Sequence, residues 1–327
     1  EIARIVGYDQ LPATLPTAAL QLALPAAADL TDAARSVLVD RGYFEAVTYS
    51  FIAESLALAF APAQTPVLLQ NPIAKDMAAM RPSLLPGLLG ALAANRNRQH
   101  TDVRLFELGM RFNRVAAELS QEMALAGVVC GRLLPDQWGG DGREFDFYDL
   151  KQDVSAVLGA LGQCAPQLVS CEHVALHPGQ SAALTHGGQV LGLIGRLHPR
   201  MCKLLDLEIS PLVFEIYLEV LQAPATPAFR PLSRFPSTRR DLAVVVDQTV
   251  SAGQVLDVVR GAAGPHLRDL QLFDVYQGQG IDSGKKSLAL GLLFQASSST
   301  LNEPEIEQAI AATLAALARE VGGALRK

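Results

Sequence analysis

Residues 287–295 read SLALGLLFQ, and this stretch decides the fold of the C-terminal third of the chain. Leu288, Leu290, Leu292 and Phe294 fall at every second position. Side chains at alternate positions of an extended chain lie on the same side of it. The stretch therefore predicts a β-strand with one buried side.

Two further strands and a helix are expected before it. DLAVVVD (241–247) and LRDLQLFDVYQG (267–278) read as strands. Between them, Ser251 and Gln254 have the spacing of a capping box, in which each side chain bonds the other residue's backbone N–H. The helix that opens there carries Val255, Val258 and Val259 on one face.

A long helix and a short strand are expected after it. Asn302 and Glu305 can cap this helix, and GALRK (323–327) can close as a final strand. The resulting order, βαββαβ, predicts a ferredoxin-like sandwich. The helix residues expected to face inward are Ile306, Ala309, Ile310, Leu314, Leu317 and Val321. The Pro-punctuated segment QAPATPAFRPLS (222–233) reads as a linker before this domain.

The first two thirds of the chain alternate short helices and strands. Asp29 is a good N-cap, Asp32 follows in the first turn, and Gly42 stands where a left-handed cap belongs, so a helix is expected between them. EIARIVGYDQLPATLP (1–16) reads as a helix end followed by an extended linker. The other expected elements are strands at EAVTYSFI (45–52), VRLFELGMRF (103–112) and QVLGLIGRLH (189–198), and a helix at YDLKQDVSAVLGALG (148–162).

Bulk composition limits the class of protein. The chain has 327 residues and is 50% hydrophobic, which predicts two domains with a sizeable core. Apolar runs are interrupted before the roughly 18 residues that a membrane span needs, so no membrane partner is expected. Four cysteines without a CxxC pair fit reduced thiols in the cytoplasm. The chain starts at Glu1 without a basic-then-apolar leader, so we expect no signal peptide and a start inside a helix.

The charge distribution indicates a local basic patch. Residues 230–327 hold 11 Lys and Arg against 10 Asp and Glu, and the rest of the chain holds 16 against 23. Six of those 11 basic residues are bunched, and clustering creates a potential that the net charge conceals. A solvated face is the structural alternative. The six are Arg230, Arg234, Arg239, Arg240, Lys285 and Lys286.

Several chemical motifs fail when their spacing is counted. A P-loop ending at Gly284–Lys285 would need Gly where Gln279 stands, and a G-x-G-x-x-G run would need Gly at Ser283. His177 and His198 occur in His-Pro pairs without a nearby Cys or carboxylate, which favours a role in turns. The sequence contains neither a G-x-S-x-G elbow nor an H-E-x-x-H pair, so no nucleophile is indicated.

The positive evidence for function is a resemblance that runs through the whole chain. EIARIVGYDQLP is similar to the closing helix of the small domain that precedes the synthetase-like module in bacterial phenylalanyl-tRNA synthetase β subunits. NPIAKDMAAMRPSLLPGLLGALAANRNR, VRLFELGMRF, DFYDLKQDV, ALHPGQSA and IGRLHP resemble that module, in the same order. SRFPSTRRDLAVVVD, LFDVYQGQGI and KKSLALGLLFQ resemble the anticodon-binding domain of the same family.

The resemblance implies an α+β fold in two units. It implies the end of a small domain and a linker (1–16), a class II synthetase-like antiparallel sheet with flanking helices (17–222), a linker (223–232) and a ferredoxin-like anticodon-binding domain (233–327). The helix Leu30–Gly42 and the strand after it resemble the class II interface motif, which would pair with other subunits of an (αβ)₂ tetramer. A helix packed only on its own domain is the alternative.

The resemblance also implies that this part of the ligase is catalytically silent. Active class II sites hold ATP with an Arg-x-Glu motif and a Gly-x-Gly-x-x-x-Arg motif. Here Arg104 and Glu107 are one residue too far apart, and Gly192–Arg196 does not match the second motif. ATP would therefore be bound by the partner α subunit, and this chain alone is expected to be inactive.

Site residues follow from the resemblance and from the basic patch. Glu1 stands where the last carboxylate of a Mg²⁺ site would be, but its partner carboxylates would lie before it, and hard cations need several oxygen ligands. A solvated Glu1 is the alternative. Binding of tRNA(Phe) is assigned to basic side chains that neutralise phosphates and to an aromatic on which a loop base stacks. These residues are Arg234, Arg239, Arg240, Tyr276, Lys285 and Lys286.

Alternatives remain for these residues and for the whole chain. Surface ion pairs to Asp241 or Asp282 would explain the basic side chains. Phe235 is a second candidate aromatic, with a packing anchor before Pro236 as its alternative. Tyr276 is assigned only if loop geometry brings it near the basic residues. The whole chain could also be an active single-chain phenylalanyl-tRNA synthetase of the organellar type, or an RNA-binding scaffold unconnected with aminoacylation.

Overall fold

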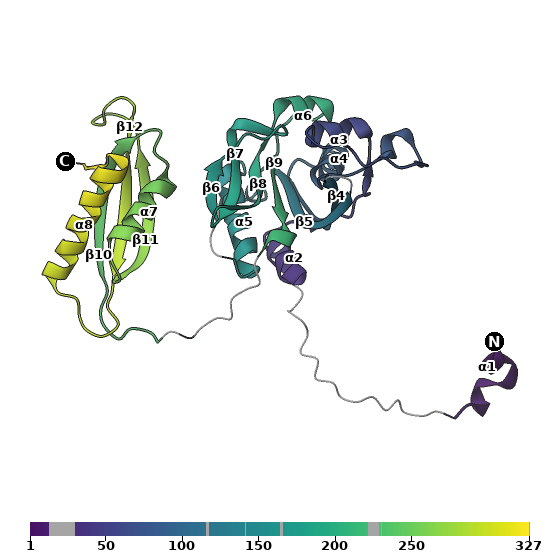
Figure 1. Ribbon diagram of the computed structural model, residues 1–327, viewed down its shortest axis with the longest axis horizontal. Coiled ribbons are helices and arrows are strands. Elements are labelled where there is room, and N and C mark those ends of the chain that lie inside the picture. Colours follow the sequence, from purple (N-terminus) through teal and green to yellow (C-terminus); the bar gives the residue numbers. More distant parts are fainter. Residues whose placement is uncertain are drawn as a thin grey trace.

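The computed structural model describes residues 1–12, 30–115, 118–140, 142–163, 166–221, 229 and 231–326. Figure 1 shows a larger sheet with helices on both sides, a smaller sheet with two helices, and a short N-terminal helix. That helix, α1 (Ile2–Val6), is followed by η1 (Tyr8–Gln10) and buries none of its side chains. The predicted N-cap Asp29 and the boundaries at 16/17 and 222/223 lie outside the described residues, so the domain limits stay predictions.

The larger sheet has seven strands in the order β1-β4-β5-β9-β8-β7-β6. Every neighbouring pair is antiparallel except β1 and β4, which run parallel at one edge. The predicted antiparallel sheet is therefore confirmed, with one parallel pair added. Its strands are β1 (Phe44–Glu45), β4 (Val103–Val115), β5 (Glu118–Cys130), β6 (Gln167–Ser170), β7 (Leu176–His186), β8 (Gln189–Leu197) and β9 (Leu212–Tyr217).

Helices cover both faces of this sheet, as Figure 1 shows. Alternation along β4 directs Phe106 to one face, where α2 (Leu30–Asp40) and α5 (Phe147–Ala160) pack, and Val103 to the other. The second face is filled mainly by leucines of α4 (Leu85–Arg96). The remaining elements are α3 (Glu54–Phe60), η2 (Lys75–Met77), α6 (Pro199–Leu204), η3 (Leu218–Val220) and a two-stranded sheet of β2 (Phe51–Ile52) and β3 (Ala79–Met80).

The expected strand over residues 45–52 is wrong in its extent. It is broken into the end of β1 and the start of β2, with irregular chain between them. At the break, the backbone N–H of Thr48 donates to the carboxylate of Glu107 (3.2 Å) and the Thr48 hydroxyl donates to the same group (2.6 Å). The local β propensity is overridden because a buried carboxylate takes the hydrogen bond that a neighbouring strand would otherwise supply.

The C-terminal domain confirms the predicted βαββαβ order. Its strands pair antiparallel in the order β11-β12-β10-β13, so the first and third strands of the domain are neighbours as expected. Both predicted capping boxes are formed, at Ser251 and at Asn302. The elements are β10 (Thr238–Asp247), α7 (Ala252–Ala262), β11 (Leu267–Tyr276), β12 (Lys285–Phe294), α8 (Glu303–Val321) and β13 (Ala324–Leu325).

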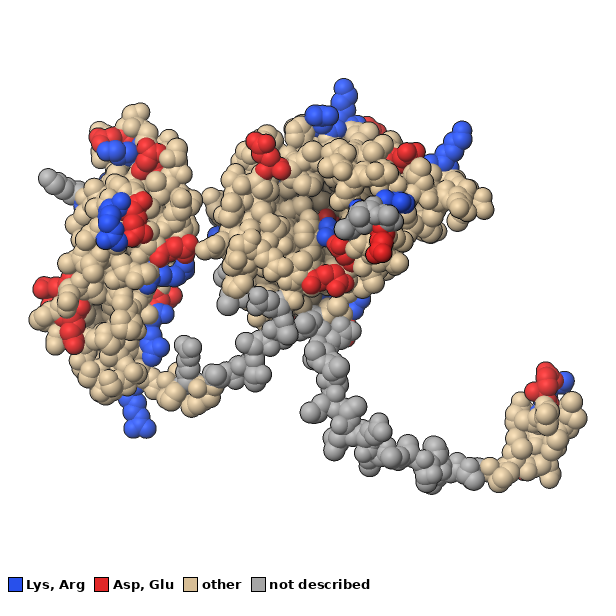
Figure 2. All heavy atoms as spheres, in the orientation of Figure 1, with Lys and Arg blue, Asp and Glu red and all other residues tan. Residues whose placement is uncertain are grey.

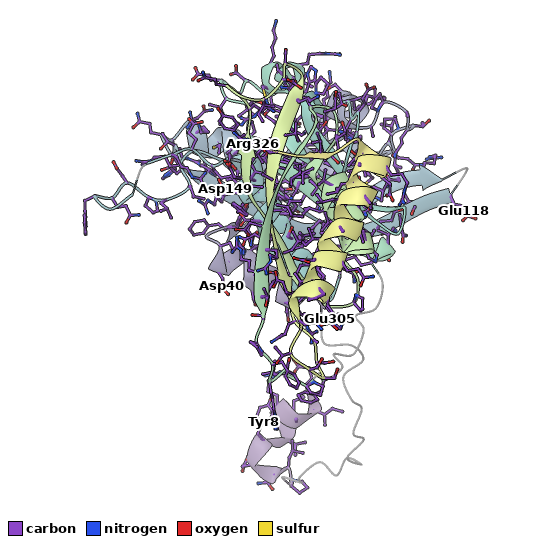
Figure 3. The ribbon with its side chains drawn as sticks, turned by 90° about the vertical axis from the view of Figure 1, so that its left-hand side faces the viewer. Tyr8, Asp40, Glu118, Asp149, Glu305 and Arg326 are labelled. Carbon is purple, nitrogen blue, oxygen red and sulfur yellow. The ribbon has the colours of Figure 1, made fainter. Side chains whose placement is uncertain are left out.

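Both helices of this domain pack on one face of its sheet. Leu288, Leu290, Leu292 and Phe294 are buried there against α7 and α8, as the alternating pattern predicts. Figure 3 shows α8 lying beside the strands, with Arg326 on the strand side. The opposite side, which we call the open face, carries residues at the alternate register positions: Arg239 and Asp241 on β10, Asp274 and Tyr276 on β11, and Ser287, Ala289 and Gly291 on β12. Phe273, the unpaired residue at the register shift of β11, contacts Arg239 on this face. None of the described helices is both long and apolar enough to cross a membrane.

Candidate nucleic-acid interface

The six residues predicted to bind tRNA do not form one cluster. Arg239 and Lys286 lie on neighbouring strands, but Arg239 pairs with Leu293 and Lys286 pairs with Val246. Seven residues separate Arg239 from Val246 along β10, which is about 23 Å at roughly 3.3 Å per residue. Antiparallel strands begin at opposite ends of the sheet, so the basic residues at the starts of β10 and β12 are kept apart. Figure 2 shows blue and red side chains interspersed over the visible side of this domain.

Arg239 and Arg240 lie on opposite faces because successive strand residues alternate. Arg240 forms an ion pair with Glu303 of α8, on the helix-covered side. Arg239 lies on the open face, where its Nε donates to Asp241 at 2.8 Å. Arg234 precedes β10 and is exposed.

The guanidinium of Arg239 packs against Gly291 of β12 and against the ring of Phe273. A Cβ added to Gly291 would meet Arg239 atoms at 2.8–3.1 Å, so the glycine leaves the space that this side chain occupies. The Arg239 Cζ also lies 5.4 Å from the centroid of Phe273, within reach of a cation–π contact. Phe273 is 48% exposed and stands at an irregularity in the pairing of β11. Sequence reasoning missed Phe273, because the pattern of LRDLQLFDVY does not reveal the bulge.

Tyr276 also lies on the open face and contacts an arginine that the sequence did not indicate. Its hydroxyl donates to the carbonyl of Gln279 at 3.1 Å, and the Cζ of Arg326 lies 5.1 Å from its ring centroid. Tyr276 is on β11 and Arg326 follows β13, which are the two edges of this sheet. The pair therefore spans the central strands β12 and β10.

The predicted lysines and the second aromatic have local partners. Lys285 Nζ lies 2.9 Å from the Asp282 carboxylate, and this hydrogen bond raises the pKa of Lys285 and lowers that of Asp282. Lys286 donates to the carbonyl of Gln248 at 3.0 Å. The backbone N–H of Phe235 donates to the Ser233 hydroxyl at 3.2 Å and the residue is half-buried, which favours the packing alternative. The two surface ion pairs given above as alternatives, Arg239–Asp241 and Lys285–Asp282, are both present. Exposed ion pairs of this kind contribute only about 0–1 kcal/mol to stability, so they do not prevent these side chains from binding RNA.

Comparison with known proteins agrees with this architecture. The family model described as "Phenylalanyl tRNA synthetase beta chain CLM domain" matches residues 11–218. A second, described as "Ferredoxin-fold anticodon binding domain", matches residues 233–326. The chain belongs to the phenylalanyl-tRNA synthetase β-chain family. The resemblance inferred from sequence motifs is thereby confirmed.

Curated relatives support the same assignment. The chain is 48% identical over 332 residues to the phenylalanine–tRNA ligase β subunit of Pseudomonas syringae pv. syringae (strain B728a), a match that covers 100% of this chain and 42% of that protein. The corresponding subunit of Nitrosococcus oceani is 42% identical over 331 residues, again covering 100% and 42%. The chain thus spans less than half the length of these relatives.

A solved structure shows only a weak likeness. The pyrrolysyl-tRNA synthetase of Desulfitobacterium hafniense aligns with a TM-score of 0.46 and 19% identity, over 58% of this chain and 64% of that one. At this level of similarity the likeness carries no argument about this chain.

Within the family's first module, the residues that resemble an ATP-binding motif are directed apart. Arg104 donates to the carbonyl of Arg41 (2.9 Å) and lies over the ring of Phe145. Glu107 is buried on the other side of β4, where Arg81 donates to it at 2.7 Å. A spacing of three residues places two strand side chains on opposite faces, so Arg104 and Glu107 cannot act on one ligand.

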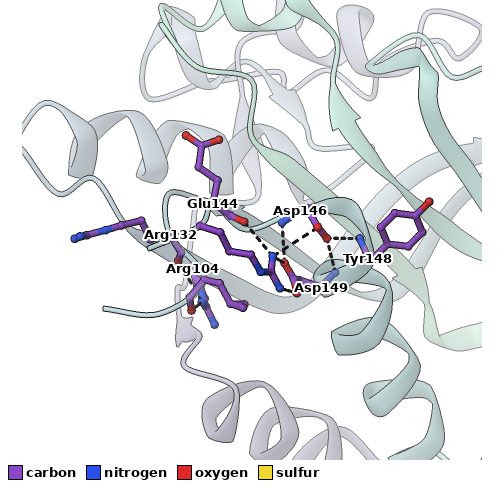
Figure 4. A network of polar contacts seen from close by, with 8 residues as sticks. Arg104, Arg132, Glu144, Asp146, Tyr148 and Asp149 are labelled. Atoms are coloured by element: carbon purple, nitrogen blue, oxygen red, sulfur yellow. Dashed lines mark hydrogen bonds and ion pairs between the residues drawn. The ribbon is translucent and has the colours of Figure 1, made fainter. Parts of the chain in front are cut away.

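Carboxylates near the start of α5 are engaged in capping the helix (Figure 4). Arg143 donates to both oxygens of Asp149, at 2.6 and 2.7 Å, and this fork lowers the pKa of Asp149. Asp146 accepts from the backbone N–H groups of Tyr148 and Asp149. These groups therefore stabilise the helix start and are not arranged as metal ligands.

The described residues do not offer a magnesium site. Within them, no group of three or more His, Cys, Asp or Glu side chains could hold a metal ion. Glu1 forms an exposed ion pair with Arg4 at 2.8 Å. The carboxylates that would complete the site are placed before Glu1 by the resemblance, so a metal role for Glu1 stays a prediction.

Glu215 is a buried acid on β9 with two hydrogen-bond donors. Its Oε1 accepts from the Ser83 hydroxyl at 3.0 Å and from the Leu84 N–H at 2.8 Å. Burial disfavours the charged form and is the largest effect, so the pKa of Glu215 is raised despite these bonds. The folded chain therefore keeps this proton to a higher pH than the unfolded chain does.

We expect Glu215→Gln to flatten the pH dependence of stability of the first module. The pKa of an unfolded Glu is about 4.3, so the contribution of Glu215 is fully present below that pH and is lost as pH rises through its higher folded pKa. Hydrogen exchange of β9 amides between pH 4.5 and 7.5 measures the free energy of opening. The exposed Glu54→Gln is the control. Identical slopes in the Glu215→Gln variant and the unaltered chain would contradict this assignment.

Proposed function

We propose that this chain serves phenylalanine–tRNA ligase as the part of the β subunit that binds tRNA(Phe) and assembles with the α subunit. The observation that carries this proposal is the succession of two family matches over residues 11–218 and 233–326, which leaves only the linker and chain ends unmatched. ATP-dependent aminoacylation then takes place on the α subunit in an (αβ)₂ tetramer in the cytoplasm. Any requirement for Mg²⁺ belongs to that whole enzyme.

Subunit assembly is supported by an apolar surface at one edge of the larger sheet. Val39, Phe44, Val47 and Tyr49 are 56%, 75%, 92% and 68% exposed. They occupy the end of α2, the edge strand β1 and the chain after it. An unpaired sheet edge with exposed apolar side chains needs a cover in a stable protein. We call these four residues the edge surface and assign it to the α subunit.

The same region also supports, in part, the alternative that this helix packs only on its own domain. Ala34 and Leu38 of α2 are fully buried in the core of their own module. The helix therefore packs on its own domain with one side, while the edge surface faces outward. The single-chain enzyme alternative loses support because Arg104 and Glu107 face apart across β4.

Binding of tRNA is assigned to the C-terminal domain. Its family match is described by anticodon binding, and its open face combines arginines with the exposed ring of Phe273 and the half-buried ring of Tyr276. Single-stranded loop bases stack on such rings, while basic groups contact phosphates. Arg234, Arg239, Arg240, Tyr276, Lys285 and Lys286 remain the proposed tRNA contacts, now distributed over two ends and two faces of the sheet.

The variant Arg239→Gln/Arg240→Gln is expected to bind tRNA(Phe) more weakly and with a flatter salt dependence. Each lost phosphate contact should lower the log–log slope by roughly 0.7–0.9. Titrations of the assembled αβ enzyme at several KCl concentrations measure both quantities, with circular dichroism to confirm folding. Arg319→Gln is the control, because it removes an exposed positive charge from α8, which carries none of the proposed contacts. If the double variant bound tRNA(Phe) with unchanged affinity and an unchanged salt slope, both arginines would have a structural role and not a binding role.

A further inference from the structure

A cavity of about 440 Å³ opens at one end of the seven-stranded sheet. Residues at the ends of β5 and β8 and at the start of β9 line it. Its volume lies within the roughly 300–1,000 Å³ that is typical of small-molecule sites. Part of its wall is apolar and is formed by Val129, Ile209 and Leu212. The cavity is therefore large enough for a small organic ligand.

Two arginines that line the cavity have no acidic partner. Arg96 is the last residue of α4, and Arg196 is the last but one of β8. Both residues are half-buried. Within the described part of the chain, neither guanidinium forms an ion pair. A partly buried charge without a counter-ion is unfavourable, so an anion that enters the cavity would be stabilised there.

Hydrogen bonds hold both guanidinium groups in place and leave some of their donors free. The Nε of Arg196 donates to the side-chain oxygen of Gln180 at 2.7 Å, and its Nη1 donates to the carbonyl of Ser210 at 2.8 Å. The Nη1 of Arg96 donates to the carbonyl of Thr101 at 3.2 Å. Among the described residues, Nη2 of Arg196 and both Nε and Nη2 of Arg96 have no acceptor. Each guanidinium has five N–H donors, so each can be positioned by the protein and still bond a ligand.

The acidic groups around the cavity do not neutralise these two arginines. Asp102 accepts from Nε and Nη2 of Arg132, at 3.1 and 2.9 Å, so the charges of this pair cancel. Glu144 is exposed, and Figure 4 shows its carboxylate apart from the guanidinium of Arg132. Because water screens an exposed charge, Glu144 weakens the attraction of an anion only slightly. The cavity thus keeps the positive charges of Arg96 and Arg196.

We propose that this cavity binds a small molecule that carries a phosphate monoester, with Arg96 and Arg196 bonding the phosphate. A phosphate monoester carries a charge of roughly −1.5 to −2 near pH 7, which matches two unpaired guanidinium groups, whereas a carboxylate matches only one. Guanidinium groups also fit the geometry of phosphate oxygens. The apolar wall then contacts the organic part of the ligand. This site lies in the first module and does not depend on tRNA binding by the C-terminal domain.

Isothermal titration calorimetry of the full 327-residue chain tests this proposal with three probes. Phenyl phosphate has both the phosphate monoester and an apolar body, benzoate has the ring but a carboxylate, and inorganic phosphate lacks the ring. We expect phenyl phosphate to bind one site per chain, and to bind more tightly than either of the others. Arg96→Gln and Arg196→Gln should each weaken its binding about 10- to 150-fold, the value of a hydrogen bond to a charged group.

Arg98→Gln is the matched control. Arg98 is exposed, lies two residues beyond the end of α4 and does not line the cavity, so this variant loses the same charge close to Arg96. Circular dichroism checks that each variant folds. If Arg196→Gln does not fold, Arg96→Gln still decides the test, because Arg96 makes a single side-chain hydrogen bond among the described residues.

Three results would overturn the inference. The first is no binding of phenyl phosphate at millimolar concentration. The second is equal affinity of the unaltered chain, Arg96→Gln and Arg98→Gln for phenyl phosphate, which would place the ligand elsewhere. The third is binding of benzoate or inorganic phosphate as tightly as phenyl phosphate, which would exclude recognition of a phosphate monoester. Each of these results leaves the proposed role in tRNA binding and subunit assembly unaffected.

Discussion

Arg81→Met is expected to lower the free energy of unfolding of the first module by about 3–5 kcal/mol, the cost of leaving a buried charge without its partner. The Arg81 and Glu107 side chains are each 3% exposed, with Nη1 and Oε1 2.7 Å apart. Arg81 also donates from Nε to the carbonyl of Met110 at 2.9 Å, so the variant loses a second bond. Hydrogen exchange read by mass spectrometry on β4 peptides resolves this module from the C-terminal domain.

The double variant Arg81→Met/Glu107→Leu provides the control. Replacing a whole buried ion pair by apolar residues of similar size is often neutral or stabilising, so most of the lost stability should return. Glu107→Leu alone should be destabilising, because Arg81 then stays charged and buried. A cost below about 1 kcal/mol in Arg81→Met would mean that water reaches Glu107, contrary to its burial.

This ion pair helps to explain why the first module is expected to be silent. The sheet face that carries Glu107 is filled by leucines of α4, and Glu107 accepts from both Thr48 and Arg81. Space for the network comes from Gly87 and Gly109, where an added Cβ would meet Thr48 or Arg81 atoms at 2.2 and 2.5 Å. Polar groups that could hold a nucleotide are thus satisfied by one another inside the protein.

The C-terminal fold was predictable because its signals are local. The alternation in SLALGLLFQ and the capping boxes at Ser251 and Asn302 depend on residues close in sequence, and all three are confirmed. The break in the strand at Thr48 was not predictable, because its cause, Glu107, lies 59 residues away.

The candidate interface was predicted less well, for geometric reasons. Adjacent arginines at 239 and 240 looked like one patch, but a strand directs them to opposite faces. The starts of two neighbouring strands looked close, but antiparallel pairing separates them. Contacts such as that of Tyr276 with Arg326 join the two edges of a sheet and leave no local pattern. The types of residue at the interface could therefore be inferred from the sequence. Which of them lie together could be known only from the pairing of the strands in the folded sheet.

Phe44→Asp/Val47→Asp is expected to abolish assembly with the α subunit. An interface that covers these two side chains gains roughly 1.5–3 kcal/mol from each, and burying an unpaired carboxylate in their place costs more. Association should therefore weaken by at least about a hundredfold, since each 1.4 kcal/mol is tenfold. Native mass spectrometry of the chain co-expressed with the α subunit measures the fraction in αβ and (αβ)₂ species.

Val169→Asp is the matched control for this edge surface. Val169 is 51% exposed and lies on β6, the opposite edge strand of the same seven-stranded sheet. Its substitution introduces one charge on an exposed apolar edge residue but leaves the edge surface intact, so assembly should persist. The Phe44→Asp/Val47→Asp chain should still bind the tRNA(Phe) anticodon stem-loop, because the C-terminal domain carries its own core. If the double variant assembled as fully as the unaltered chain, the α subunit would have to dock elsewhere, and the edge surface would need another cover.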